Sequence, residues 1–148
     1  MQRKWVVLGA SLAALALLTT ALPLLAADES PLAKIMEKVN AKNGAIRKNT
    51  RTAVAYKKAA KDVVKDANEL VKLAKDARAI KDAATKQKKP YESWTKLMDA
   101  FIGSAENVAK VAGDEKSTQK DASDAFRKMG ATCTNCHNEF RVEEDELK

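Results

Sequence analysis

Two thiols and one imidazole lie within five residues of one another near the C-terminal end of the chain. Cys133, Cys136 and His137 occur in the segment ATCTNCHNEFR, residues 131–141, and they are the only cysteines and the only histidine among the 148 residues. Side chains of these types can form a disulfide, a redox-active dithiol, a zinc site or the attachment point of a haem. The spacing and the surrounding sequence must decide among these four chemistries.

The sequence disfavours three of these four chemistries. A disulfide is possible in an exported protein, but a bridge between Cys133 and Cys136 would close a four-residue ring inside a helix and constrain very little. A dithiol of the thioredoxin kind opens a helix in a βαβ setting, and no segment alternates as a strand does. A structural zinc ion takes four ligands, and no further Cys or His exists to complete the set.

The spacing Cys-x-x-Cys-His is the attachment signal of c-type haem. The two thiols bond covalently to the two vinyl groups of the porphyrin, and the imidazole that follows directly approaches the iron from one side. We therefore expect one haem c per chain, bound through Cys133 and Cys136, with His137 as an axial ligand of the iron. His137 cannot occupy both faces, so the other face needs a different ligand or stays open.

The first 27 residues have the pattern of a secretory signal peptide. Arg3 and Lys4 precede an apolar run from Trp5 to about Leu18, which continues more loosely to Ala26, and Asp28 follows two small residues. An uncleaved membrane anchor is the alternative, because about 20 apolar residues can span a bilayer. The sequence thus predicts a signal peptide at 1–27, a domain at 28–148, a periplasmic location and no membrane span in the mature form. Haem attachment of this type takes place outside the cytoplasm in bacteria, which agrees with export by a signal peptide.

The rest of the chain predicts helices only. The 27 Lys and Arg residues alternate with 20 Asp and Glu residues along presumed solvent-exposed helix faces, which argues against a nucleic-acid partner. Ser30 caps the first expected helix and Pro31 opens it. Asn49 and Thr50 are the candidate caps in the next turn, Gly113 ends the third helix, and Ser117 caps the fourth. A polar connection covers 82–90. The expected helices cover 31–47, 51–80, about 90–112 and 118–143.

Apolar residues repeat at four-three spacing along these helices, which predicts an all-α, up-down-up-down antiparallel four-helix bundle. The first helix is the least regular, because Asn43 interrupts its apolar positions. The inward positions are Leu32, Met36, Val39 and Ile46; Val63, Ala67, Leu70, Ala74 and Ala77; Trp94, Met98, Phe101, Ala105, Val108 and Ala112; and Ala122, Phe126, Met129, Cys133, Cys136 and Phe140.

At this point the chain resembles the cytochrome c′ family, the class II c-type cytochromes. That family carries the motif Cys-x-x-Cys-His-x-x-Phe/Tyr-Arg in the last helix of a four-helix bundle, and here it is matched by Cys133, Cys136, His137, Phe140 and Arg141. The segment PYESWTKL resembles the start of the family's third helix. The resemblance implies a haem near the C-terminal end of the last helix, with Trp94 and Phe140 packed against it and Arg141 beside a propionate.

A methionine is the candidate for the other face of the iron. Met36 and Met98 both lie near the start of helices that run in the same direction, at the height of His137, and the residues alone leave the two open. Met129 shares a helix with His137 and cannot reach the opposite face. The resemblance favours Met36, because members with six-coordinate iron take this ligand from the first helix.

Ligation by His and Met raises the reduction potential and closes the iron to substrates. The expected function is therefore a one-electron carrier and not an enzyme, working with redox-partner proteins as a monomer or a homodimer. Two alternatives stay open. One is a five-coordinate cytochrome c′ that binds nitric oxide or carbon monoxide. The other is a helical interaction domain without haem.

Overall fold

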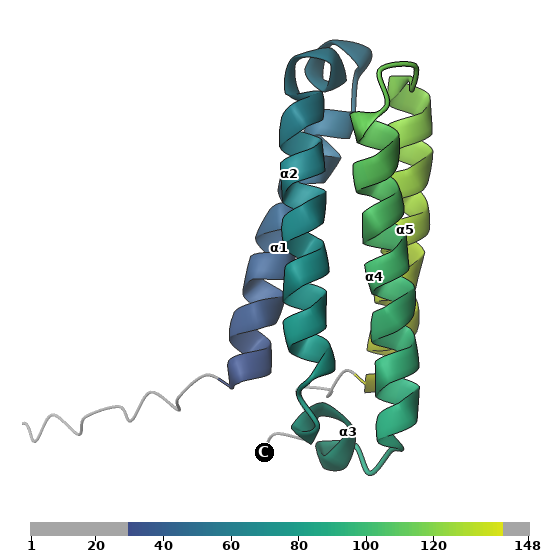
Figure 1. Cartoon of the computed structure of the whole chain (residues 1–148). Coiled ribbons are helices and arrows are strands. Elements are labelled where there is room, and N and C mark those ends of the chain that lie inside the picture. The colour runs from purple at the N-terminus through teal and green to yellow at the C-terminus, as the bar shows by residue number, and fades with distance from the viewer. Residues whose placement is uncertain (1–29, 141–148) are drawn as a thin grey trace, which may run out of the picture.

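The computed structural model describes residues 30–140, and within this range the chain is entirely helical. Four long helices lie side by side as a bundle, with the α1–α2 and α4–α5 connections at one end and the short α3 at the other (Figure 1). The expected signal peptide at 1–27, Arg141 and the last residues of the helix expected at 118–143 lie outside the described residues. The helices are α1 (Pro31–Thr50), α2 (Ala53–Arg78), α3 (Asp82–Lys86), α4 (Tyr91–Gly113) and α5 (Gln119–Phe140).

The start of α1 confirms the prediction, whereas the next boundary was wrong by two residues. Ser30 Oγ accepts a hydrogen bond from Ala33 N at 3.2 Å, and Pro31 opens the helix. The α2 cap is Thr52, whose Oγ1 accepts from Ala55 N at 3.2 Å, and not Asn49 or Thr50. The buried Thr50 side chain instead donates back to Ile46 O at 2.8 Å, so α1 continues through it.

The cap expected at Ser117 was also wrong, because the next hydroxyl makes these bonds. Thr118 Oγ1 accepts from Asp121 N at 3.3 Å, and the Asp121 carboxylate accepts from Thr118 N at 2.8 Å. This reciprocal pair is a capping box with an aspartate in place of the usual Glu or Gln. It satisfies two backbone donors at the start of α5, while α4 ends at Gly113 as predicted.

Part of the expected polar connection at 82–90 is helical. Ala83 and Ala84 are strong helix formers, and Ala84 is buried in the same apolar cluster as Trp94. The short α3 ends in a Schellman motif, in which Lys89 N donates to Ala84 O and Lys88 N donates to Thr85 O, both at 3.0 Å. Lys88 adopts the left-handed conformation with φ 51°.

We expect Lys88→Gly to raise the free energy of unfolding by about 1 kcal/mol, because glycine takes the left-handed conformation without the Cβ clash. Urea denaturation followed by circular dichroism measures the change. Lys86→Gly is the matched control, since Lys86 ends α3 in a right-handed helical conformation where glycine is unfavourable. The two variants should move stability in opposite directions, and a loss of stability in Lys88→Gly would contradict the prediction.

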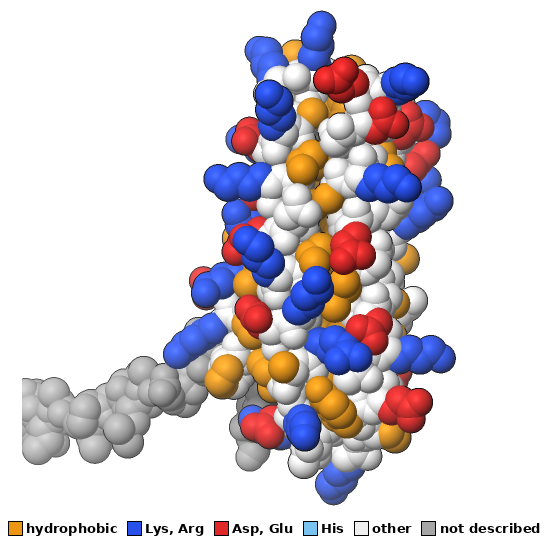
Figure 2. Space-filling model, viewed as in Figure 1, with side chains coloured by type: hydrophobic (Ala, Val, Ile, Leu, Met, Phe, Trp, Pro, Cys, Tyr) orange, Lys and Arg blue, Asp and Glu red, His pale blue; other side chains and the backbone are white. Residues whose placement is uncertain are grey.

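The inward positions expected for α2 and α4 are all buried, which confirms both patterns. These two helices pack closely on each other, α1 packs on α2, and α5 packs on α4. Within α2 the only break is Ala59, whose φ of −125° and ψ of 16° lie outside the helical range. Lys, Arg, Asp and Glu side chains are interspersed over the face formed by α2 and α4 (Figure 2).

The side of the bundle formed by α1 and α5 differs from the other three sides, because these two helices make few close contacts with each other. Ile46 is the only buried member of the expected α1 pattern, while Leu32, Met36 and Val39 are half-buried. On α5, Phe126, Cys133 and Phe140 are half-buried as well. A cavity lies between these two helix faces at the α3 end of the bundle. Within 30–140 no helix is both long and apolar enough to cross a membrane.

Candidate functional site

A largely apolar cavity of about 400 Å³ separates α1 from α5, with α4 as its third wall. This volume is within the range of small-molecule and cofactor sites. The lining residues are Leu32, Met36, Val39, Asn40 and Asn43 of α1, Trp94, Met98 and Phe101 of α4, and Thr132, Cys133, Cys136, His137 and Phe140 of α5.

The fold brings almost every site residue expected from the sequence to this one cavity. The residues proposed to attach haem and to ligate iron lie on its α5 wall, and Met36 lies on the facing α1 wall. Met98 also lines the cavity, from α4. Met129 lies fully buried in the main core and does not line the cavity, in agreement with its exclusion as a ligand.

The α5 wall presents the two thiols and the imidazole in different environments. Cys136 is 6% exposed, Cys133 is half-buried, and both are free thiols, whereas His137 is exposed at the rim. Burial disfavours the thiolate and raises the pKa of Cys133; for Cys136, burial and then the nearby Cys133 and Glu139 raise the pKa to about 11. Both sulfurs are therefore protonated at neutral pH, which argues against a reactive dithiol.

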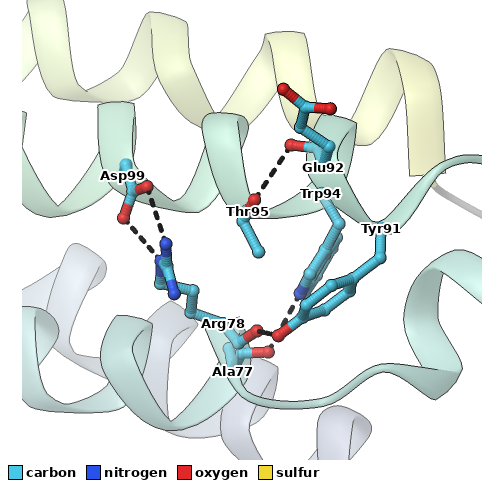
Figure 3. Close-up of polar contacts among 7 residues, drawn as sticks. All are labelled: Ala77, Arg78, Tyr91, Glu92, Trp94, Thr95 and Asp99. Atoms are coloured by element: carbon cyan, nitrogen blue, oxygen red, sulfur yellow. Dashed lines mark hydrogen bonds and ion pairs between the residues drawn. The ribbon is translucent and has the colours of Figure 1, made fainter.

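The α4 wall is built around Trp94, which is 2% exposed. Its indole N–H donates to Ala77 O at 3.1 Å, and its ring meets Phe140 edge-on, with centroids 5.3 Å apart and an interplanar angle of 75° (Figure 3 shows the hydrogen bond). Lys89 also lies over the Phe140 ring, with Nζ 5.4 Å from the ring centroid, and donates to Glu139 O at 2.5 Å. The aromatic pair thus joins the α4 and α5 walls.

Two further contacts fix the start of α4 against the end of α2 (Figure 3). The Tyr91 hydroxyl donates to Arg78 O at 2.7 Å. The Arg78 guanidinium forms a two-point ion pair with Asp99, at 2.6 and 3.0 Å, and this hydrogen bonding lowers the pKa of Asp99. These bonds limit how far the Trp94 wall can move relative to α2.

We expect Trp94→Phe to lower the free energy of unfolding by about 1–3 kcal/mol, because the smaller ring leaves a void and the buried Ala77 carbonyl keeps only the Ile80 N–H of its two donors. Denaturant unfolding of the purified protein measures this loss. Tyr91→Phe is the matched control, since it removes a donor to the next carbonyl at a half-buried position, for a net cost of about 0.5–1.5 kcal/mol. An equal or larger cost in the control would show that burial does not set the penalty.

The α1 wall contains two polar residues that the sequence did not assign to a site. Asn40 is exposed at the rim, whereas the Oδ1 atom of Asn43 is buried without any hydrogen-bond partner. The signal for Asn43 was its interruption of the apolar pattern of the first helix. Thr132 was missed because its hydroxyl lies 3.3 Å from Ser104 Oγ, a contact that only the packing of α4 on α5 creates. The same hydroxyl donates to Met129 O at 2.7 Å within α5.

The donor set is compatible with a covalently attached haem. Two thiols, an imidazole and two thioethers face one apolar cavity, and aromatic rings form one of its sides. A zinc ion is less compatible, because among residues 30–140 no group of three or more His, Cys, Asp or Glu side chains could hold a metal ion. Comparison with protein-family models, curated proteins and solved structures finds no match.

Proposed function

We propose that the chain is a monohaem c-type cytochrome of the cytochrome c′ type, an up-down-up-down bundle that carries single electrons between redox proteins of the periplasm. One observation carries the proposal: a single cavity is lined both by the Cys-x-x-Cys-His motif and by Met36. Bound haem would supply a one-electron Fe(III)/Fe(II) couple, which takes an electron from a donor protein and gives it to an acceptor. The protein acts as a carrier and not as an enzyme, either as a monomer or as a homodimer.

Each wall of the cavity has its own part in this proposal. Cys133 and Cys136 hold the haem covalently, and His137 ligates the iron from the α5 side. Met36 supplies a thioether from α1, which favours Fe(II) and raises the reduction potential. Trp94 and Phe140 exclude water from the porphyrin face, and Arg141 pairs with a propionate.

Expression in a bacterium that attaches haem in its periplasm tests the proposal. After denaturing electrophoresis of the periplasmic fraction, the full-length product should retain haem stain, and the native reduced protein should show the sharp α-band of low-spin iron. A chain of the expected size without haem stain would favour the haem-free helical domain and overturn the proposal. Haem recovered only with the membrane fraction would contradict cleavage of the signal peptide.

A five-coordinate cytochrome c′ that binds nitric oxide or carbon monoxide is the second candidate, and one observation favours it. Asn40 and Asn43 line the cavity on the α1 side, where their amides can donate a hydrogen bond to a small ligand. This candidate predicts a broad, high-spin reduced spectrum that changes when carbon monoxide is added.

A further inference from the structure

Asn43 occupies a position on α1 where the spacing of buried side chains favours an apolar residue. On α1 it falls between Val39 and Ile46, at the spacing of the inward-facing side chains. Its Oδ1 atom is buried, and no group among residues 30–140 donates to it. A buried acceptor without a donor destabilises a folded protein, so the amide needs a partner that the described chain does not provide.

A purely structural role does not account for this amide. A buried asparagine can fix the register of packed helices, but it does so by bonding to a polar group on the facing helix. The Oδ1 atom of Asn43 accepts no such bond from α5. Exchanging the amide oxygen and nitrogen would place a donor at the same buried point.

Water is the partner whose chemistry fits either orientation of the amide, because it both donates and accepts hydrogen bonds. Asn43 lines the haem cavity and also a second groove of about 520 Å³ farther along α1 and α5, whose other lining residues include Arg47, Ser123 and Arg127. The amide therefore lies where the apolar cavity meets a polar, solvent-exposed groove. Thr132, whose hydroxyl oxygen can accept a further bond, lines the same cavity. Ordered internal waters occupy polar sites with several such partners.

We infer that Asn43 holds an ordered water molecule at the side of the haem cavity that meets this groove, and that this polar pair lowers the reduction potential. The inference rests on the proposed haem function. A polar environment stabilises the oxidised state, which carries one more positive charge than the reduced state. Asn43 thereby offsets part of the increase in potential that thioether ligation by Met36 produces.

Three variants of the haem-loaded full chain test the role of Asn43. Asn43→Leu removes the polar group and should raise the reduction potential, with the low-spin spectrum unchanged. Asn68→Leu makes the same chemical change at an exposed position of α2 that lines neither the cavity nor the groove, and it should leave the potential close to that of the wild type. Asn43→Ser keeps a hydroxyl and leaves room for water, so its potential should stay much nearer to the wild-type value than that of Asn43→Leu.

Three outcomes overturn the inference: no increase in Asn43→Leu, an equal increase in Asn68→Leu, or a shift in Asn43→Ser as large as that in Asn43→Leu. Urea unfolding gives a readout that does not depend on electron transfer. Asn43→Leu should unfold at a higher urea concentration than Asn43→Ser, because leucine completes the apolar face of α1. A wild-type protein without covalent haem would refute the proposed function itself, whereas a haem protein with unshifted variants refutes only the role of Asn43.

Discussion

A Cys133→Ala/Cys136→Ala double variant should lose all haem stain after denaturing electrophoresis, whereas the wild-type chain keeps it. The two thioether bonds are the proposed covalent links, and ligands such as His137 release haem when the protein unfolds. Each single variant keeps one thiol that can react with a vinyl group, so each should retain stain at reduced yield. The measurement is stain intensity divided by the amount of protein in the band.

The residues between the two cysteines provide a matched control. Thr134 and Asn135 are exposed on α5 and do not line the cavity. A Thr134→Ala/Asn135→Ala variant makes the same number of substitutions within the same helical turn and should stain as the wild type does. Persistent stain in the cysteine double variant would place the attachment elsewhere. Loss of stain in the control would mean that the segment is needed for recognition before attachment and would weaken the argument from the thiols.

The parts of the fold that the sequence predicted well are those in which burial is continuous. Val63, Leu70 and Ala77 recur every seven residues because α2 contacts a neighbour along its length, and periodicity alone reveals such a face. Helix ends were harder, since neighbouring hydroxyl residues compete for the same capping role. Thr50 was lost as a cap because packing buries it, and burial of one side chain depends on where the other helices lie.

The candidate site likewise contains residues that a local sequence pattern reveals and residues that only the packing of helices brings together. Cys133, Cys136 and His137 are recognisable because attachment chemistry imposes a local spacing, and height along the bundle indicated Met36 and Met98. Asn40 and Thr132 could not be assigned from the sequence, because they belong to helices that are far apart in the chain. They line the same cavity only because α1 and α5 diverge there. Asn43 was visible in the sequence only as a defect in a pattern. Its proposed role depends on the absence of a hydrogen-bond partner for its Oδ1 atom within 30–140, which only the packed structure reveals.

Met36→Leu should convert the protein from low-spin to high-spin iron and lower its reduction potential. Leucine removes the thioether but nearly conserves the volume, so the fold should lose less than about 1.5 kcal/mol of stability. Loss of an axial methionine removes the ligand that favours Fe(II), and it opens one face of the iron. Absorption spectra of both redox states, with a potentiometric titration, measure the two effects.

Met98→Leu is the matched control, because it makes the same change in another methionine that lines the same cavity. Met98 is 4% exposed, whereas Met36 is half-buried, so side-chain packing alone would make Met98→Leu the more disruptive of the two. Ligation predicts the reverse order in the spectra: a large change in Met36→Leu and almost none in Met98→Leu. If Met98→Leu alone becomes high-spin, the sixth ligand comes from α4.

The same pair of variants separates the electron carrier from the gas-binding alternative. A closed iron in the wild type should bind carbon monoxide poorly, and Met36→Leu should bind it readily, because the substitution leaves a coordination position open. A wild type that is already high-spin, binds carbon monoxide and is unaffected by Met36→Leu would identify the five-coordinate alternative. In that case Met36 is a packing residue of α1, and the amides of Asn40 and Asn43 become the groups that face the bound gas.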